Sequence, residues 1–142
     1  MHSQIPSESV RILSPPDIVQ ARTTARRMAA GIGFGIADQI RLATAVSELT
    51  RNVLQYAGIG VCSFEDASDG TQIRLRATVE DNGPGILDIG MAMKDGFSTS
   101  HGLGAGLPGT RRLMDVFYIE SVPGLTRIII TLERERLLES SK

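Results

Sequence analysis

The chain has 142 residues, of which 42% are hydrophobic and 22% charged, a balance typical of one soluble globular domain. Its net charge of −1 argues against broad binding to nucleic acid or to an anionic membrane surface. No apolar run approaches the ~20 residues that span a bilayer, and the N-terminus lacks signal-peptide character, so we expect a cytoplasmic protein. The single cysteine, Cys62, is expected to be a small core residue.

The first half of the chain predicts one short strand and two helices. Residues 1–9 are polar and expected to be flexible, and residues 10–13 have strand character. Apolar residues at helical spacing predict a helix over 18–30, which the glycine-rich segment 31–35 ends. A second helix is predicted over 37–56. Its expected core stripe consists of Ile40, Ala43, Val46, Leu49, Val53 and Leu54.

The second half predicts two pairs of strands around two glycine-rich loops. Residues 60–64 and 71–80 form a hairpin, the latter with strict period-2 alternation. Residues 88–95 can form a short helix, and 102–109 open another that runs to about 114. Strands over 117–121 and 126–132 follow, and the charged tail 133–142 suggests a frayed helix. Hairpins mixed with grouped helices predict an α+β fold, a sheet covered on one face by helices, in one domain over 10–132.

The segment 81–86, Asp-Asn-Gly-Pro-Gly-Ile, combines a carboxylate at a strand end with two glycines. Glycine adopts positive φ at little cost, and its lack of a Cβ lets a ligand approach the backbone closely. An ionised Asp81 only accepts hydrogen bonds, which suits the exocyclic amino group of adenine. The alternative is a strand-to-helix turn with a capping aspartate. The six residues alone do not decide between these interpretations.

Two further features gain meaning from their order along the chain. Glu48 and Asn52 stand four residues apart on one helical face, where the glutamate can take a proton from a hydroxyl and the asparagine can bind Mg²⁺. The glycine run 102–109 places free N–H groups at a helix N-terminus, which binds phosphate. Alone, the pair would be a solvated helix face and the run a hinge. The run is not a P-loop, since no lysine follows it in the required place.

Taken together, segments 48–52, 81–86 and 102–107 resemble the N, G1 and G2 boxes of the GHKL superfamily of ATPases, over about residues 10–132. That resemblance implies the Bergerat ATP-binding fold, a two-layer sandwich of a mixed, mainly antiparallel sheet covered on one face by helices. Segments 43–58, 95–99 and 106–115 closely resemble the RsbT-type switch-protein kinases of bacterial stressosomes. Ser100-His101 and Ala105 depart from the family pattern and bear on the dynamics of a lid over 96–103.

The resemblance also implies roles for individual residues. Glu48 is expected to be the catalytic base and Asn52 the Mg²⁺ ligand, with ATP and Mg²⁺ as cofactors. Asp81 is expected to anchor adenine, and Thr126 to support that contact. The other residues expected around the nucleotide are Gly83, Gly85, Ile86, Gly102, Leu103, Gly104, Gly106 and Leu107.

By this resemblance the chain is expected to be an ATP- and Mg²⁺-dependent protein serine/threonine kinase. Its substrates would be STAS-domain scaffold or antagonist proteins, and its release would activate a PP2C-type phosphatase by partner switching. Neither nucleic acid nor a membrane is an expected partner. The alternative is a nucleotide-gated binding module, such as an anti-sigma factor, that acts by sequestration; retention of Glu48 favours the kinase.

Overall fold

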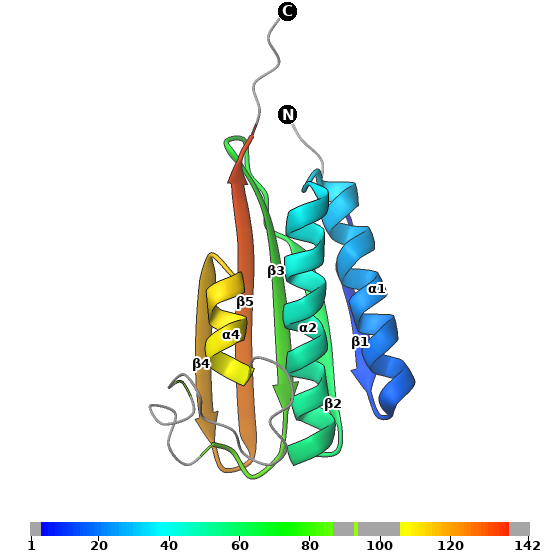
Figure 1. Ribbon diagram of the computed structural model, residues 1–142, viewed down its shortest axis with the longest axis vertical. Helices are drawn as coiled ribbons and strands as arrows, with labels where there is room; N and C mark the ends of the chain where they lie inside the picture. The colour runs from blue at the N-terminus through cyan, green and yellow to red at the C-terminus, as the bar shows by residue number, and fades with distance from the viewer. Residues whose placement is uncertain (1–3, 87–92, 94–105, 137–142) are drawn as a thin grey trace, which may run out of the picture.

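The computed structural model describes residues 4–86, 93 and 106–136, which form a five-stranded sheet with helices on one face (Figure 1). The strand order is β1-β2-β3-β5-β4. In chain order the described elements are β1 (Glu8–Ile12), α1 (Pro15–Ile32), α2 (Ile36–Tyr56), β2 (Gly60–Asp66), β3 (Gln72–Asp81), α4 (Gly106–Leu113), β4 (Val116–Val122) and β5 (Leu125–Glu135).

The predicted two-layer α+β architecture is confirmed, with one correction to the sheet. Every strand pairing among the described residues is antiparallel, whereas a mixed, mainly antiparallel sheet was expected. Short turns join β2 to β3 and β4 to β5, and such connections force antiparallel neighbours. Strand β5 then pairs on its other edge with β3, again antiparallel.

The core lies between the sheet and the helices. Alternate residues of β3 face the helices and are buried, namely Leu75, Ala77 and Val79. Cys62 of β2 is fully buried, which confirms it as a core residue. None of the helices in the described part of the chain combines the length and apolar character needed to cross a bilayer.

Helix α1 is delimited by local chemistry at both ends. The Asp17 carboxylate, at the third helical position, accepts hydrogen bonds from the backbone N–H groups of Leu13 (2.8 Å) and of the N-cap Ser14 (3.0 Å), as in a capping box. The helix ends at Ile32, and Gly33 follows with φ of 122°, a conformation that favours glycine. The glycine-rich stop predicted for this helix is therefore confirmed.

Helix α2 buries a different stripe from the one expected at its start. Ile40 is 50% exposed, whereas Leu42 and Ala45 are fully buried. The helix packs against both the sheet and α1. The buried part of its surface is therefore wider than the predicted core stripe and is rotated relative to it. The expected positions Ala43, Val46, Leu49 and Val53 are buried, and Leu54 is partly buried against the core.

The last strand is longer than predicted. The frayed helix expected from residue 133 is wrong for 133–135, because β5 continues to Glu135, which pairs with Gln72 of β3. An ion pair of 2.9 Å between Arg74 and Glu133 crosses the same two strands. The remaining tail, 137–142, and all but Met93 of the short helix expected over 88–95 lie outside the described residues.

Candidate functional site

Asp81 is the last residue of β3 and begins the loop 81–86. Its Oδ1 accepts a hydrogen bond of 2.9 Å from the backbone N–H of Gly83, and the side chain is half-buried. Burial raises the pKa of the Asp81 carboxyl, and the Gly83 hydrogen bond opposes that shift. The loop therefore presents a partly desolvated carboxylate whose second oxygen remains available to a donor.

The two glycines of this loop are required by packing. A Cβ on Gly83 would lie 2.7 Å from the Cβ of Ala57, the residue that follows α2. Gly85 has φ of +87°, and a Cβ there would lie 2.6 Å from the carbonyl oxygen of Val122 in β4. The absence of both side chains lets the loop pack against the end of α2 on one side and against β4 on the other.

Thr126 lies directly beside this loop. It is buried in β5 and pairs in register with Asp81 of β3. Its Oγ1 is 2.6 Å from Oγ of Ser121 in β4, and Ser121 also accepts a hydrogen bond of 2.7 Å from the backbone N–H of Ile86. Sequence reasoning missed Ser121. Only the register between strands β4 and β5 reveals it.

The turn between β4 and β5 is attached to the same loop. The backbone N–H of Gly124 donates to the carbonyl of Gly83 at 2.9 Å. The amide of Asn82 donates to the carbonyl of Gly124 at 3.0 Å. These two bonds hold the ends of three strands together around Asp81.

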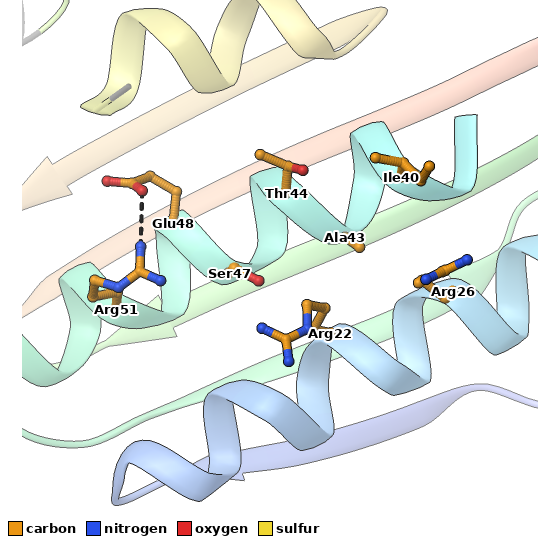
Figure 2. A pocket seen from close by; sticks show the side chains of 8 residues that line it. All are labelled: Arg22, Arg26, Ile40, Ala43, Thr44, Ser47, Glu48 and Arg51. Carbon is orange, nitrogen blue, oxygen red and sulfur yellow. Dashed lines mark hydrogen bonds and ion pairs between the residues drawn. The ribbon is translucent and has the colours of Figure 1, made fainter. Parts of the chain in front are cut away.

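Glu48 and Asn52 lie on α2, as predicted. Glu48 is only 7% exposed, and its Oε1 accepts a hydrogen bond of 2.9 Å from Nη1 of Arg51 (Figure 2). Asn52, one turn further on, is half-buried, and its side chain makes no hydrogen bond to another described residue. It precedes Ala57 by five residues, about 7.5 Å along the helix axis. Since Ala57 touches the loop at Gly83, both polar side chains lie on the helix that abuts the loop.

The surroundings of Asn52 suit a Mg²⁺ ion that is held by few protein oxygens and mainly by waters and phosphate oxygens. No group of three or more histidine, cysteine, aspartate or glutamate side chains capable of holding a metal occurs among the described residues. A metal site built from three such side chains is therefore absent from that part of the chain. Mg²⁺ commonly keeps several waters and takes one or two protein oxygens together with phosphate oxygens, and the uncommitted Asn52 amide suits that role.

Helix α4 begins beside α2 (Figure 1). Gly106, its first residue, has φ of +67°. Leu107 and Thr110 are buried, and the Thr110 hydroxyl donates to the carbonyl of Gly106 at 3.0 Å. Gly102, Leu103 and Gly104 lie outside the described residues. The predicted phosphate-binding segment is thus described only from Gly106 onward.

A cavity of about 320 Å³ opens between α1 and α2 next to Glu48 (Figure 2). Arg22 and Arg26 enter it from α1 and form no ion pair with any described residue. Ser47, on α2, has the one buried side-chain polar atom without a hydrogen-bond partner in the described part of the chain. The full lining is Arg22, Arg26, Ile40, Ala43, Thr44, Ser47, Glu48 and Arg51.

Comparison with known proteins identifies a family, a curated relative and solved structures with the same fold. Residues 37–136 match the family described as histidine kinase-, DNA gyrase B- and HSP90-like ATPases. The serine/threonine-protein kinase RsbT of Bacillus subtilis (strain 168) is 53% identical over 115 residues, which cover 81% of this chain and 86% of that protein.

Solved structures that share the fold include two of mycobacterial proteins. The RsbU and RsbW domains of a Mycobacterium tuberculosis protein superpose with a TM-score of 0.67 at 20% identity. The match covers 94% of this chain but 34% of that one, so this chain spans about a third of its length. The mycobacterial sensor histidine kinase MprB has a TM-score of 0.54 at 16% identity, with 94% of this chain and 100% of that chain covered.

Proposed function

The chain belongs to the family of histidine kinase-, DNA gyrase B- and HSP90-like ATPases and, within it, to the RsbT-type serine/threonine protein kinases, and from this premise we propose how its residues bind ATP and transfer phosphate. The observation that carries the proposal is the junction of α2 with the 81–86 loop. Glu48 and Asn52 lie on the helix whose end contacts Gly83, so chemistry and nucleotide binding are brought to one end of the sandwich.

The 81–86 loop binds the adenine base. Asp81 accepts a hydrogen bond from the exocyclic amino group, and Thr126, opposite it in register, supports that contact. Gly83, Gly85 and Ile86 form the wall of the pocket. Gly106 and Leu107 follow the phosphates at the start of α4, where free backbone N–H groups attract anions. We also predict that this phosphate-binding segment includes Gly102, Leu103 and Gly104.

Glu48 acts as the general base. Arg51 occupies its Oε1, which leaves Oε2 to accept the proton of the attacking hydroxyl. The hydroxyl oxygen forms a bond to the γ-phosphorus as the bond from that phosphorus to the bridging oxygen breaks; ADP leaves and the proton ends on Glu48. Mg²⁺, when bound, would neutralise negative charge on the phosphates, and Asn52 would be its protein ligand.

The acceptors are serine or threonine hydroxyls of STAS-domain scaffold or antagonist proteins, and release from them lets the kinase activate a PP2C-type phosphatase. The 53% identity to RsbT, a serine/threonine-protein kinase, supports transfer to a serine or threonine hydroxyl. The STAS-domain acceptors and the phosphatase are proposed from the motif resemblance. The cavity with Arg22 and Arg26 offers a protein acceptor a surface immediately beside Glu48. Of the two functions that the sequence left open, the kinase is favoured over the sequestration module because the relative is itself a kinase.

The test is phosphotransfer from γ-labelled ATP, with Mg²⁺, to STAS-domain proteins from the same source. We expect label on serine or threonine, and loss of the base in Glu48→Gln should lower the transfer rate by at least ~10²-fold. The dissociation constant for ATP should stay within about threefold, since a base that touches only the acceptor contributes little to nucleotide binding.

The matched control is Glu65→Gln, which removes an equivalent carboxylate that pairs with Arg76 on the exposed face of the sheet. It should leave both transfer and binding unchanged. Tight ATP binding with no labelled protein would instead favour the sequestration module. Unchanged transfer in Glu48→Gln would remove Glu48 from the catalytic role.

A further inference from the structure

Asp81, Thr126 and Ser121 form one row across three strands. Thr126 pairs in register with Asp81 on β3 and with Ser121 on β4. Directly opposed residues of antiparallel strands point to the same face of a sheet. Thr126 lies two residues before the buried Ile128, so the row points to the helix-covered face, where the 81–86 loop also packs. The row therefore forms the floor beside that loop.

The Ser121 hydroxyl contacts two different segments within this arrangement. It accepts the backbone N–H of Ile86 at 2.7 Å, and its Oγ lies 2.6 Å from Oγ1 of Thr126. At that separation one hydroxyl must donate to the other. A hydroxyl that accepts a hydrogen bond becomes a better donor, because hydrogen bonds in a chain polarise one another. The Ile86 N–H thus favours Ser121 as the donor and Thr126 as the acceptor.

The direction of the hydrogen bond between Ser121 and Thr126 decides whether Thr126 presents a donor or an acceptor to a ligand. A hydroxyl has one proton and two lone pairs. If Ser121 donates to Thr126, Thr126 keeps its own proton for the pocket, and the row presents an acceptor, Asp81, next to a donor. If Thr126 donated to Ser121, the pocket would meet only lone pairs. Adenine has an amino donor next to a ring-nitrogen acceptor, whereas hypoxanthine has a carbonyl acceptor next to a ring N–H donor.

We propose that Ser121 is a positioning residue that orients the Thr126 hydroxyl as a donor and thereby makes the pocket selective for adenine over hypoxanthine or guanine. The inference rests on the proposed nucleotide site. Ser121 acts through Thr126 and through the Ile86 backbone, which also holds the loop in place. Without the Ser121 hydroxyl, the Thr126 hydroxyl can rotate and act toward the base either as a donor or as an acceptor.

The experiment is calorimetric titration of the full chain with ATP and with ITP. In Ser121→Ala we expect the dissociation constant for ATP to rise about tenfold, the effect of losing one well-oriented hydrogen bond, and that for ITP to change less than about twofold. The preference for ATP over ITP should narrow accordingly. Because Ser121 acts on binding, the rate of phosphotransfer at saturating ATP should fall much less than the affinity for ATP does. Ser121→Thr, which keeps the hydroxyl, should retain the wild-type preference for ATP over ITP.

Two further variants separate selectivity from folding. Ser63→Ala is the matched control, because Ser63 makes a similar hydroxyl pair of 3.0 Å with Ser9 on the exposed side of the sheet; its ATP to ITP preference should equal that of the wild type. Ser121→Cys nearly preserves the volume but donates weakly. It should narrow the preference by about threefold, and it replaces Ser121→Ala if that variant does not fold.

The outcomes distinguish this inference from the proposed function. Equal losses of ATP and ITP affinity in Ser121→Ala and in Ser121→Cys would indicate a structural role and overturn the inference. Wild-type protein that binds the two nucleotides equally would contradict the adenine site, and the inference with it. A selective wild type that transfers no phosphate would contradict the phosphotransfer proposal and leave the role of Ser121 intact.

Discussion

Asp81 shows a conflict between folding and binding in a single side chain. Burial raises the pKa of its carboxyl, which means that the folded chain disfavours the ionised form. The proposed contact to adenine requires that same ionised form, since only it offers acceptors alone. The folded protein therefore keeps a charge whose desolvation costs free energy, at the position where the proposed contact to adenine needs that charge.

The substitution Asp81→Asn tests this conflict. The ionised carboxyl lowers the stability of the fold at pH values above its raised pKa, and this loss disappears as the pH falls below the unfolded value. Without ligand, Asp81→Asn should therefore have the higher melting temperature at pH 7, with the difference closing toward pH 4. Nucleotide affinity should fall ~10- to 100-fold, as expected for a lost hydrogen bond to a charged group.

Melting curves between pH 4 and pH 8 and ATP titrations at pH 7 measure the two effects. The amide retains an oxygen for the Gly83 N–H, so the loop itself should survive the change. An unchanged ATP affinity would contradict the assignment of Asp81 to adenine. A melting temperature that falls at pH 7 would contradict the stated cause of the pKa shift.

At the scale of elements, the 81–86 loop works as a spacer between α2 and β4. Gly83 faces Ala57 at the end of the helix, and Gly85 faces Val122 in the strand. The first contact fixes the loop relative to the helix that bears Glu48 and Asn52. Packing between elements therefore sets the geometry between the proposed catalytic and nucleotide-binding groups.

Gly83→Ala should displace the loop from α2. The new methyl group would lie 2.7 Å from the Ala57 Cβ, and we expect unfolding in urea to show a loss of about 1–3 kcal/mol, as for other overpacked sites. ATP affinity should fall with it. The double variant Ala57→Gly/Gly83→Ala should recover part of both losses, because the opposing methyl group is then absent while the Ala57 Cα and the Asp81 Oδ1 still lie 3.1 Å from the new methyl group.

The control for this prediction is Gly70→Ala in the β2–β3 turn. A Cβ there meets nothing within 4 Å, so stability should change by less than about 0.5 kcal/mol. Failure of Ala57→Gly to give any rescue of Gly83→Ala would show that the contact with the Ala57 methyl group is not the cause of the losses. The contacts at 3.1 Å with the Ala57 Cα and the Asp81 Oδ1 would then account for them.

At the scale of the whole molecule, the layer of helices seals the sheet around Cys62. The thiol is fully buried between the layers, and burial raises its pKa to about 12. It has no described thiol partner and is a weak nucleophile in the folded state. Its reactivity therefore reports the separation of the two layers.

Labelling of Cys62 with a thiol reagent at pH 8 should be slow in the folded protein and fast in urea. When opening and closing are fast relative to labelling, the rate follows the population of the open state. ATP with Mg²⁺ at 100 times the dissociation constant should slow labelling about 100-fold, because the ligand binds only the folded form. Fast labelling of the folded protein would contradict the sealed core, and labelling that ATP does not slow would contradict nucleotide binding to that form.

Local signals in the sequence determined the class of fold, the long helix α2, the strands and the turn at Asp81. Periodicity, caps and turn residues act over a few positions, so they are visible without knowledge of distant neighbours. The motif resemblance determined the kinase family, which the comparisons confirm. The roles assigned to Glu48, Asn52, Asp81 and Thr126 stay predictions.

Contacts between distant segments decided the rest. Ile40 was wrongly placed in the core because the buried arc of α2 depends on what packs against it, and β5 runs to Glu135 because β3 offers partners that far. Ser121 stands 35 positions from Ile86 and five from Thr126, and only the register across three strands brings the three together. Such contacts depend on how the chain packs in three dimensions, and no local pattern records them.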